Sequence, residues 1–541
     1  MDEDWLIIRD QPYLANWHSI KTAFQDAIQG LYYRPVQIVT YIIDYHIGGA
    51  NPFIYHFNNV LLHTLSVVML YKLLLEFNIK KVNAFFLTAV FAVHPVALHA
   101  VAWIPGRHDL LLCLFTIASC YHLIKYIKTG SIFNALSQLV FFTLALFTKE
   151  NSVFLFPVFV FIFIIFPPVN KKKAAILSAV WLLQISVWYY MLTAVIKTTL
   201  TAGAGFFTTL KSFTYAMLMF IGKSFIPVNQ SVAPIYDTIS VIAGIVVIIL
   251  IFLVWYKWGV ANKKIAMLGV GIYFALLAVA VWFGSTLPTG EHLEHRVYTS
   301  MIGVIILLSQ FRIDLNSKTV RRVFSLVIIA LGLKTFVRLN VYSNEVSYLS
   351  EAVKDCPKNY FYHARLGNFL SDRKEYRKAL DCYNTAIGLY NKKPQVYNDR
   401  ANAYFNLNKK DEAIADYTKA YELGKNPQVL LFRCLAYKKF GDLQNAFRDL
   451  TVLSQCCRDL LPPGLEQEIV SGLVTTRMDE LNRMIAAEPT NALLYVNRAK
   501  FYIDYRMGKE ALADLKKACE LEPDNKEYKG YYNELNNSFP H

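Results

Sequence analysis

Long apolar stretches recur through the first 342 residues and favour a bundle of membrane helices. Hydrophobic residues make up 55% of the 541-residue sequence, a high share for a soluble protein of this length. Because no water reaches the backbone inside a bilayer, such stretches are expected to cross it as helices that satisfy their own hydrogen bonds. The predicted spans lie near 53–75, 83–104, 108–127, 132–148, 152–168, 174–196, 236–256, 265–284, 297–311 and 323–341.

The charge pattern divides the chain at the same point as the apolar stretches. Residues 343–541 carry 29 Lys and Arg against 27 Asp and Glu, so 26 of the 55 basic residues but only 13 of the 40 acidic residues precede them. A nucleic-acid partner would need a basic patch on a folded soluble domain, whereas this basic excess lies in short loops between spans. The basic excess is therefore explained more simply by positive loops at a membrane surface, and no nucleic-acid partner is expected.

The basic loops also predict a topology. Lysines and arginines cluster in alternate loops, which the positive-inside rule assigns to the cytoplasm. Residues 205–227 are apolar enough to span, but a span here would reverse the later loops, so an interfacial or re-entrant helix is expected. The N-terminus, the loops around 105–108, 149–151 and 285–296, and residues 343–541 are then predicted to lie on the non-cytoplasmic side, in a periplasm or a lumen.

Ionisable residues gather on that predicted face. Such groups are costly at a membrane and usually mark a working site. The alternative is that they are solvated loop charges or snorkelling anchors, a description that suits Lys149 or Arg107 taken singly. The acids of the cluster are Asp2, Glu3, Asp4, Asp109, Glu150 and Glu294; its bases are Arg34, Arg107, Lys149, His295 and Arg296; His56 and His99 lie in the outer parts of their spans. His63 and His94, deeper in the membrane, are expected to be packed or hydrogen-bonded.

Residues 343–541 repeat with a period of 34 residues. "HARLGNFLSDRKEYRKALDCYNTA" is followed by "YNDRANAYFNLNKKDEAIADYTKA", and later by "YVNRAKFYIDYRMGKEALADLKKACELEP". This is the tetratricopeptide (TPR) pattern of helix hairpins, which stack into a groove suited to a peptide or a partner helix. The fold class is therefore all-α, with residues 1–52 as an acidic non-cytoplasmic loop with amphipathic helices, 53–342 as a multi-pass membrane domain and 343–541 as a TPR solenoid.

Four segments, in order, resemble the transmembrane and tetratricopeptide repeat (TMTC) proteins, relatives of the protein O-mannosyltransferases with the GT-C fold. They are "YYRPVQIVTYIIDYHIGGANPFIYHFNNVLLH", "FAVHPVALHAVAWIPGRHDLL", "LALFTKENSVFLFP" and "EHRVYTSMIG". The resemblance implies a glycosyltransferase that takes a sugar from a polyprenyl-phosphate donor and acts on the non-cytoplasmic face. Relatives usually carry Glu at the place of His99, and a span before the acidic loop.

The resemblance also implies roles for single residues. Asp2, Glu3 and Asp4 occupy the loop that carries the family's catalytic acids, so Asp2 or Asp4 is the expected base toward an acceptor hydroxyl, which a protein Ser or Thr would supply. Asp109 belongs to a GRxD turn, Glu150 to a KE step, and Glu294 and His295 to an EHR motif. Arg34, Arg107, Lys149 and Arg296 are assigned to the donor phosphate. A divalent cation, Mg²⁺ or Mn²⁺, on Asp2 and Asp4 remains open.

Two other function classes stay open at this stage. One is a non-enzymatic membrane scaffold whose repeats recruit partners, and the other is a transporter or ligase for polyprenyl-linked glycans, which would not need the N-terminal acids. Within the enzyme hypothesis, the repeats bind either the acceptor protein or an assembly partner. An acidic loop outside the cytoplasm normally follows a delivering helix, so a lost first span is expected, unless span 53–75 inserts with its N-terminal flank translocated.

Overall fold

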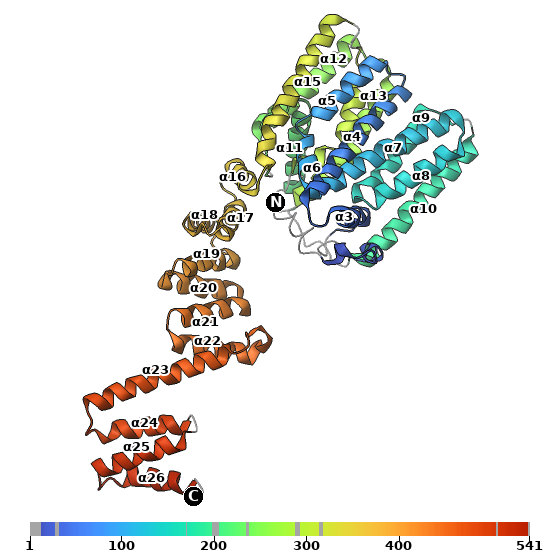
Figure 1. Ribbon diagram of the computed structural model, residues 1–541. Helices are drawn as coiled ribbons and strands as arrows, with labels where there is room; N and C mark the ends of the chain where they lie inside the picture. The colour runs from blue at the N-terminus through green and yellow to red at the C-terminus, as the bar shows by residue number, and fades with distance from the viewer. Residues whose placement is uncertain are drawn as a thin grey trace. The chain divides into compact units, whose positions relative to one another are not determined.

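The computed structural model describes residues 12–26, 32–168, 170–196, 205–233, 237–286, 293–312, 317–504 and 507–538. The chain forms two compact units, Met1–Tyr362 and His363–His541. Helices make up the regular structure of the described residues, with one isolated bridge between Val260 and Phe311 and no strand. The all-α prediction is confirmed (Figure 1).

The first unit contains a bundle of long helices with short helices at their ends (Figure 1). Its elements are η2 (Pro12–Ala15), α2 (Ser19–Ala23), α3 (Pro35–Gly48), α4 (Pro52–Glu76), α5 (Lys81–Val93), α6 (Ala97–Ala102), η3 (Ile104–Gly106), α7 (Arg107–Thr129), α8 (Ile132–Leu146), η4 (Glu150–Phe154), α9 (Leu155–Ile165), α10 (Lys171–Val195), α11 (Phe206–Phe225), α12 (Thr238–Trp258), α13 (Lys263–Thr286), η5 (Glu294–Val297), α14 (Met301–Ser309), α15 (Lys318–Leu339), η6 (Asn340–Tyr342) and α16 (Glu345–Asp355).

Six helical stretches among the described residues are long and apolar enough to cross a membrane. They are Pro52–Glu76, Ile104–Thr129, Lys171–Val195, Thr238–Trp258, Lys263–Trp282 and Lys318–Tyr342. Several of these helices expose apolar side chains along their length, as expected for helices that face lipid. Helix α15, for example, buries no residue and exposes Leu333 and Phe336. The chain is a multi-pass membrane protein.

Four predicted spans are shorter or broken in the structure. The stretch 132–148 forms α8, whose 15 residues are fewer than those of the six long helices. The stretch 83–104 is interrupted after α5, because Pro95 has no backbone N–H to donate and restricts His94 to extended backbone. The stretch 152–168 yields only η4 and α9, and 297–311 yields a 3₁₀ turn and the nine-residue α14. These breaks turn backbone and polar side chains toward the bundle interior, where the candidate site lies.

The helices of the first unit meet closely at glycines. Gly269 on α13 lies so near α14 that a Cβ atom there would stand 2.6 Å from the carbonyl oxygen of Gly303 and 2.7 Å from the amide nitrogen of Leu307. Gly222 on α11 and Gly244 on α12 oppose each other in the same way, which packs the predicted interfacial helix directly on α12. Small residues at such crossings are typical of membrane helix pairs.

The second unit is a row of helix hairpins (Figure 1). Most of α17 (Tyr360–Asp372) falls within it, followed by α18 (Tyr376–Leu389), α19 (Pro394–Asn406), α20 (Lys410–Gly424), α21 (Pro427–Lys439), α22 (Leu443–Cys456), η7 (Arg458–Leu460), α23 (Leu465–Ala487), α24 (Ala492–Asp504), α25 (Gly508–Leu521) and α26 (Lys526–Ser538). The recurring alanines of the 34-residue pattern, Ala379, Ala413 and Ala511, are fully buried, as the repeat predicts.

An ion pair joins the two helices of three hairpins at the same register. Arg400 donates to both carboxylate oxygens of Asp416 at 2.7 Å, and Arg433–Asp449 and Arg498–Asp514 repeat the arrangement. Each aspartate is buried, so these two-pronged bonds are stronger than surface pairs.

Gly269→Val is expected to destabilise the membrane unit strongly, because its side chain would collide with the backbone of α14. Gly271→Val, two residues along the same helix, is the control, since a Cβ atom there meets nothing within 4 Å. Thermal unfolding of both variants of the full chain in detergent measures the difference. Equal midpoints would contradict the close packing of α13 on α14.

Asp416→Asn is expected to lower the local stability of its hairpin by about 1–3 kcal/mol, because the half-buried Arg400 guanidinium loses a charged partner. Asp411→Asn on the same helix is the control, since Asp411 is exposed. Hydrogen exchange on the full chain should show faster exchange in α19 and α20 for the first variant alone. Unchanged protection in Asp416→Asn would show that the repeated ion pairs are dispensable.

Candidate active site

The three N-terminal acids Asp2, Glu3 and Asp4 lie outside the described residues. Their assignment as the base, and as ligands of a divalent cation, stays a prediction. The other predicted site residues are described, and each can be placed.

Asp109 and Lys149 form a buried ion pair at the centre of the site. Asp109 lies in the first turn of α7, where the helix dipole favours a carboxylate, and Lys149 lies between α8 and η4. Lys149 Nζ donates to Asp109 Oδ1 at 2.6 Å, and both residues are about 5% exposed or less. Gly106, directly before α7, packs closely on α6, because a Cβ atom there would stand 2.6 Å from the carbonyl oxygen of Ala100.

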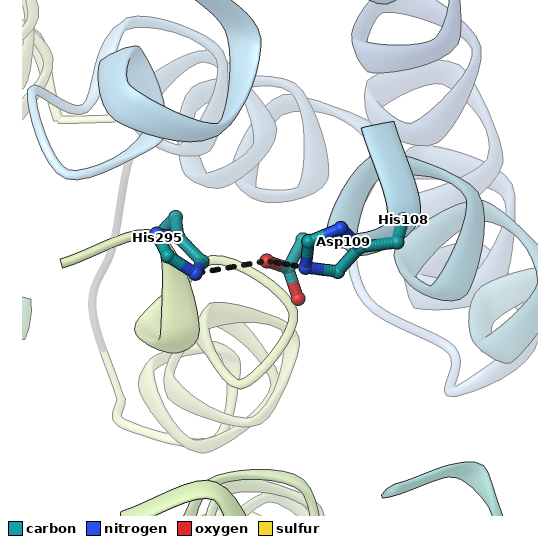
Figure 2. Close-up of side chains that lie close together, drawn as sticks. All are labelled: His108, Asp109 and His295. Carbon is teal, nitrogen blue, oxygen red and sulfur yellow. Dashed lines mark ion pairs between the residues drawn. The ribbon is translucent and has the colours of Figure 1, made fainter. Parts of the chain in front are cut away.

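Two histidines face the other oxygen of Asp109 (Figure 2). His108 Nε2 lies 3.2 Å from Asp109 Oδ2, and His295 Nε2, from η5, lies 4.0 Å from it. His108 Nδ1 is 2.6 Å from the carbonyl oxygen of Pro105. Burial lowers the pKa of His295 well below its usual range, so this imidazole is neutral.

Arg34 and Glu150 form the most open ion pair of the site. Arg34 donates to Glu150 Oε1 at 2.9 Å, and its guanidinium lies over the ring of Tyr32. The side chain of Arg34 is 11% exposed and that of Glu150 is 38% exposed. Burial alone would raise the pKa of Glu150, but the Arg34 cation and then Lys149 outweigh it and lower that pKa to about 2.

Arg107 is enclosed completely by protein groups. It pairs with Asp44 on α3, donates to Asn59 Oδ1 at 2.9 Å, and donates to the carbonyl oxygen of Tyr55 at 2.9 Å. In this arrangement it ties α3 and α4 to α7. Its assignment to the donor phosphate stays a prediction, and would require phosphate to replace these partners.

Glu294, the residue before His295 in η5, is held by groups from other elements. Lys223 on α11 donates to Glu294 Oε1 at 2.6 Å, and the backbone N–H of Ser231 donates to the same oxygen at 2.7 Å. The Ser231 hydroxyl in turn donates to Asp355 at the end of α16. Arg296, beside this group, donates to the carbonyl oxygen of Ala280 at 2.8 Å.

The remaining histidines separate into two groups. His99 is buried on α6 with its ring 5.1 Å from that of His295, while His56 is half-buried on α4. His63 is paired with the Tyr298 hydroxyl at 2.8 Å and the carbonyl oxygen of Ala92 at 3.0 Å, and His94 is buried, as expected for packed histidines.

The structure therefore brings Arg34, Lys149, Asp109, Glu150 and His295 together, whereas Arg107 and Arg296 bond other groups. In this network Arg34 pairs with Glu150, the residue after Lys149, and Lys149 and His295 both face Asp109. Glu294, the residue before His295, pairs with Lys223. Sequence reasoning missed three members as site residues, His108, Asp44 and Lys223. Asp44 was detectable as the lone carboxylate in the apolar helix α3, and Lys223 as one of two lysines in the apolar helix α11, and such charges imply an opposite charge nearby.

Fold and network together define a multi-pass membrane protein with a buried ionic site and a TPR array. A tetratricopeptide repeat family model matches residues 394–427. Protein O-mannosyl-transferase F38B6.6 from Caenorhabditis elegans is 27% identical over 384 residues, which cover 66% of this chain and 54% of that protein. Protein O-mannosyl-transferase TMTC1 from Mus musculus is 32% identical over 151 residues, 26% of this chain and 16% of that protein.

These relatives confirm the predicted resemblance: the chain is TMTC-like. It spans about half the length of the first relative and less of the second. Among solved structures, the TPR protein YrrB, described as having an unusual peptide-binding site, covers 35% of this chain and 98% of its own at 18% identity and a TM-score of 0.23.

Glu150→Gln should reduce the stability of the chain at neutral pH and leave it nearly unchanged in acid. The folded-state pKa of Glu150 lies below that of an unfolded glutamate, so its ionic stabilisation is complete above about pH 4.3 and is lost as the pH falls toward about 2. Thermal midpoints of wild type and variant, measured across this range, should converge on acidification.

Arg34→Gln provides the control for this pH dependence, because without the cation the Glu150 pKa returns toward its ordinary value. A constant difference between wild type and Glu150→Gln at every pH would contradict the ion pair as its cause.

Proposed function

We propose that this chain is a membrane glycosyltransferase that moves a sugar from a polyprenyl-phosphate donor to a hydroxyl of an acceptor, a protein Ser or Thr. The names of the relatives support the transfer class and make mannose the first sugar to test. The observation that carries the proposal is the network of lysine, arginine and carboxylate pairs, buried where short helices interrupt the membrane bundle.

The chemistry requires a base and an anion site. A carboxylate accepts the proton of the attacking hydroxyl while the bond between the sugar C1 and the phosphate oxygen breaks, and the phosphate keeps the bonding electrons. No acid is needed for that leaving group, because cations stabilise its charge. Arg34, Lys149 and Arg296 are the proposed cations and Asp2 or Asp4 the proposed base, with His56, His99, Asp109, Glu150, Glu294 and His295 as supporting polar groups.

Arg34 is more exposed than Lys149: 11% of the Arg34 side chain is accessible, against 6% of the Lys149 side chain. Its carboxylate partner Glu150 is the most exposed acid in the network, so a phosphate arriving there would displace the least deeply buried pair. Lys149 follows directly in the chain and lies behind it. Arg34 is therefore the proposed first contact of the phosphate.

The TPR unit is proposed to hold the acceptor protein and raise its concentration near the membrane site. In this proposal the acidic N-terminal loop and the repeats lie on the non-cytoplasmic side, in a periplasm or lumen. A divalent cation, Mg²⁺ or Mn²⁺, on Asp2 and Asp4 would assist departure of the phosphate.

The variants Asp2→Asn and Asp4→Asn are expected to show which of the two acids is the catalytic base. The variant that removes the base should lose about 10²–10⁴-fold in transfer rate, whereas Asp26→Asn, an exposed acid further along the same region, should retain the wild-type rate. The assay follows a labelled polyprenyl-phosphate mannose in membranes that contain the full chain and an acceptor protein.

Wild-type activity in both acid variants would overturn the base assignment. Absence of transfer by a folded, inserted wild-type chain would favour the non-enzymatic scaffold.

A further inference from the structure

Three buried side chains of metal-ligand type meet in the first unit (Figure 2). They are His108 and Asp109 from the first turn of α7 and His295 from η5. One ligand atom of each residue lies within 4.8 Å of the others, and all three residues are about 5% exposed or less. The two elements are far apart in sequence, so the fold and not the local chain brings the three together.

The hydrogen bonds of His108 and Asp109 leave two facing atoms, His108 Nε2 and Asp109 Oδ2, without a proton between them. A carbonyl oxygen only accepts, so the 2.6 Å contact with Pro105 places the proton of His108 on Nδ1. The lone pair of Nε2 then faces Asp109 Oδ2 at 3.2 Å, and that buried oxygen has no hydrogen-bond donor. Two acceptors facing each other need a cation or an additional proton between them.

A metal ion satisfies this arrangement with one centre, whereas a second proton on Nε2 would give His108 a positive charge inside the protein. The outer contacts are also those that hold metal ligands in place. Pro105 fixes the tautomer and the ring of His108, and Lys149 binds the other oxygen of Asp109 at 2.6 Å. Both ligating groups are thus oriented before any ion arrives.

We propose that His108, Asp109 and His295 bind Zn²⁺. Two imidazole nitrogens and one carboxylate oxygen suit Zn²⁺, whereas Mg²⁺ prefers oxygen ligands alone. Three protein ligands leave one tetrahedral position for water or for an oxygen of a bound anion. This site is separate from the cation considered at Asp2 and Asp4, and it does not depend on the proposed transfer activity.

Such an ion would cross-link the first turn of α7 to η5 and the start of α14. Ligands that bind only the folded state stabilise it in proportion to their affinity, so Zn²⁺ should raise the unfolding temperature of the chain.

The test begins with the full chain, purified in detergent without chelator. Elemental analysis should find about one Zn²⁺ per chain in the wild type. His108→Gln and His295→Gln should each lower the affinity for Zn²⁺ at least tenfold. His122→Gln is the matched control, because His122 lies on the same helix, bonds Asn134 and belongs to no part of the cluster.

Two further measurements distinguish loss of a ligand from loss of the fold. Replacement of Zn²⁺ by Co²⁺ should give the visible absorption of a tetrahedral site in the wild type and in His122→Gln. His295→Cys, which supplies a thiolate, should restore Zn²⁺ binding that His295→Gln loses. A pair of charged histidines without a metal would show neither result.

The proposal is overturned if the folded wild type neither contains Zn²⁺ nor takes it up on titration. It is also overturned if the folded His108→Gln and His295→Gln variants bind Zn²⁺ as tightly as the wild type.

Discussion

A charge buried in a membrane bundle must lie beside an opposite charge, and the first unit is arranged around this constraint. Arg107 with Asp44, Lys149 with Asp109 and Lys223 with Glu294 are three such pairs, each almost completely buried. Every pair joins elements distant in the sequence. Removing either member would leave its partner charged and unsatisfied, so the pairs fix which helices must meet.

These pairs explain why the helices are interrupted where they are. A continuous helix satisfies its own backbone and directs side chains outward around its circumference. The breaks at His94–Pro95 and at η4 and η5 end that regularity and let loop residues such as Lys149 and His295 turn into the bundle. Non-helical backbone at such depth is tolerated because protein surrounds it.

The sequence carried enough information for the fold class and for the repeat unit. Apolar length predicts the spans, and the 34-residue period predicts the buried alanines of the hairpins, because both depend on local spacing. Which charged side chains pair with each other depends on tertiary contacts instead. Nothing in the spacing of Asp44 and Arg107, or of Lys223 and Glu294, indicates that they pair, so the network was predicted as a face and not as contacts.

Both units pair buried carboxylates with basic side chains, but the partners are close in sequence in the repeats and distant in the membrane unit. In the repeats, Arg400 and Asp416 lie on the two helices of one hairpin, and the same pair recurs as Arg433 with Asp449, so these hairpins each pair their own buried charges. Such a unit tolerates addition or loss of neighbours. The membrane unit has no comparable independence, because each of its three buried pairs joins elements 40 or more residues apart in the sequence.

An anion that enters the membrane unit's network must compete with one of its carboxylates for a basic side chain. A phosphate that replaces a carboxylate must expose that carboxylate to water, and the cost is least where it is already exposed. The side chain of Glu150 is 38% exposed, against 1% for Asp109 and 4% for Glu294. Exchange at Arg34 would leave Lys149 and the inner pairs in place, so a negatively charged ligand can be bound at one edge without unpairing the charges that hold the bundle together.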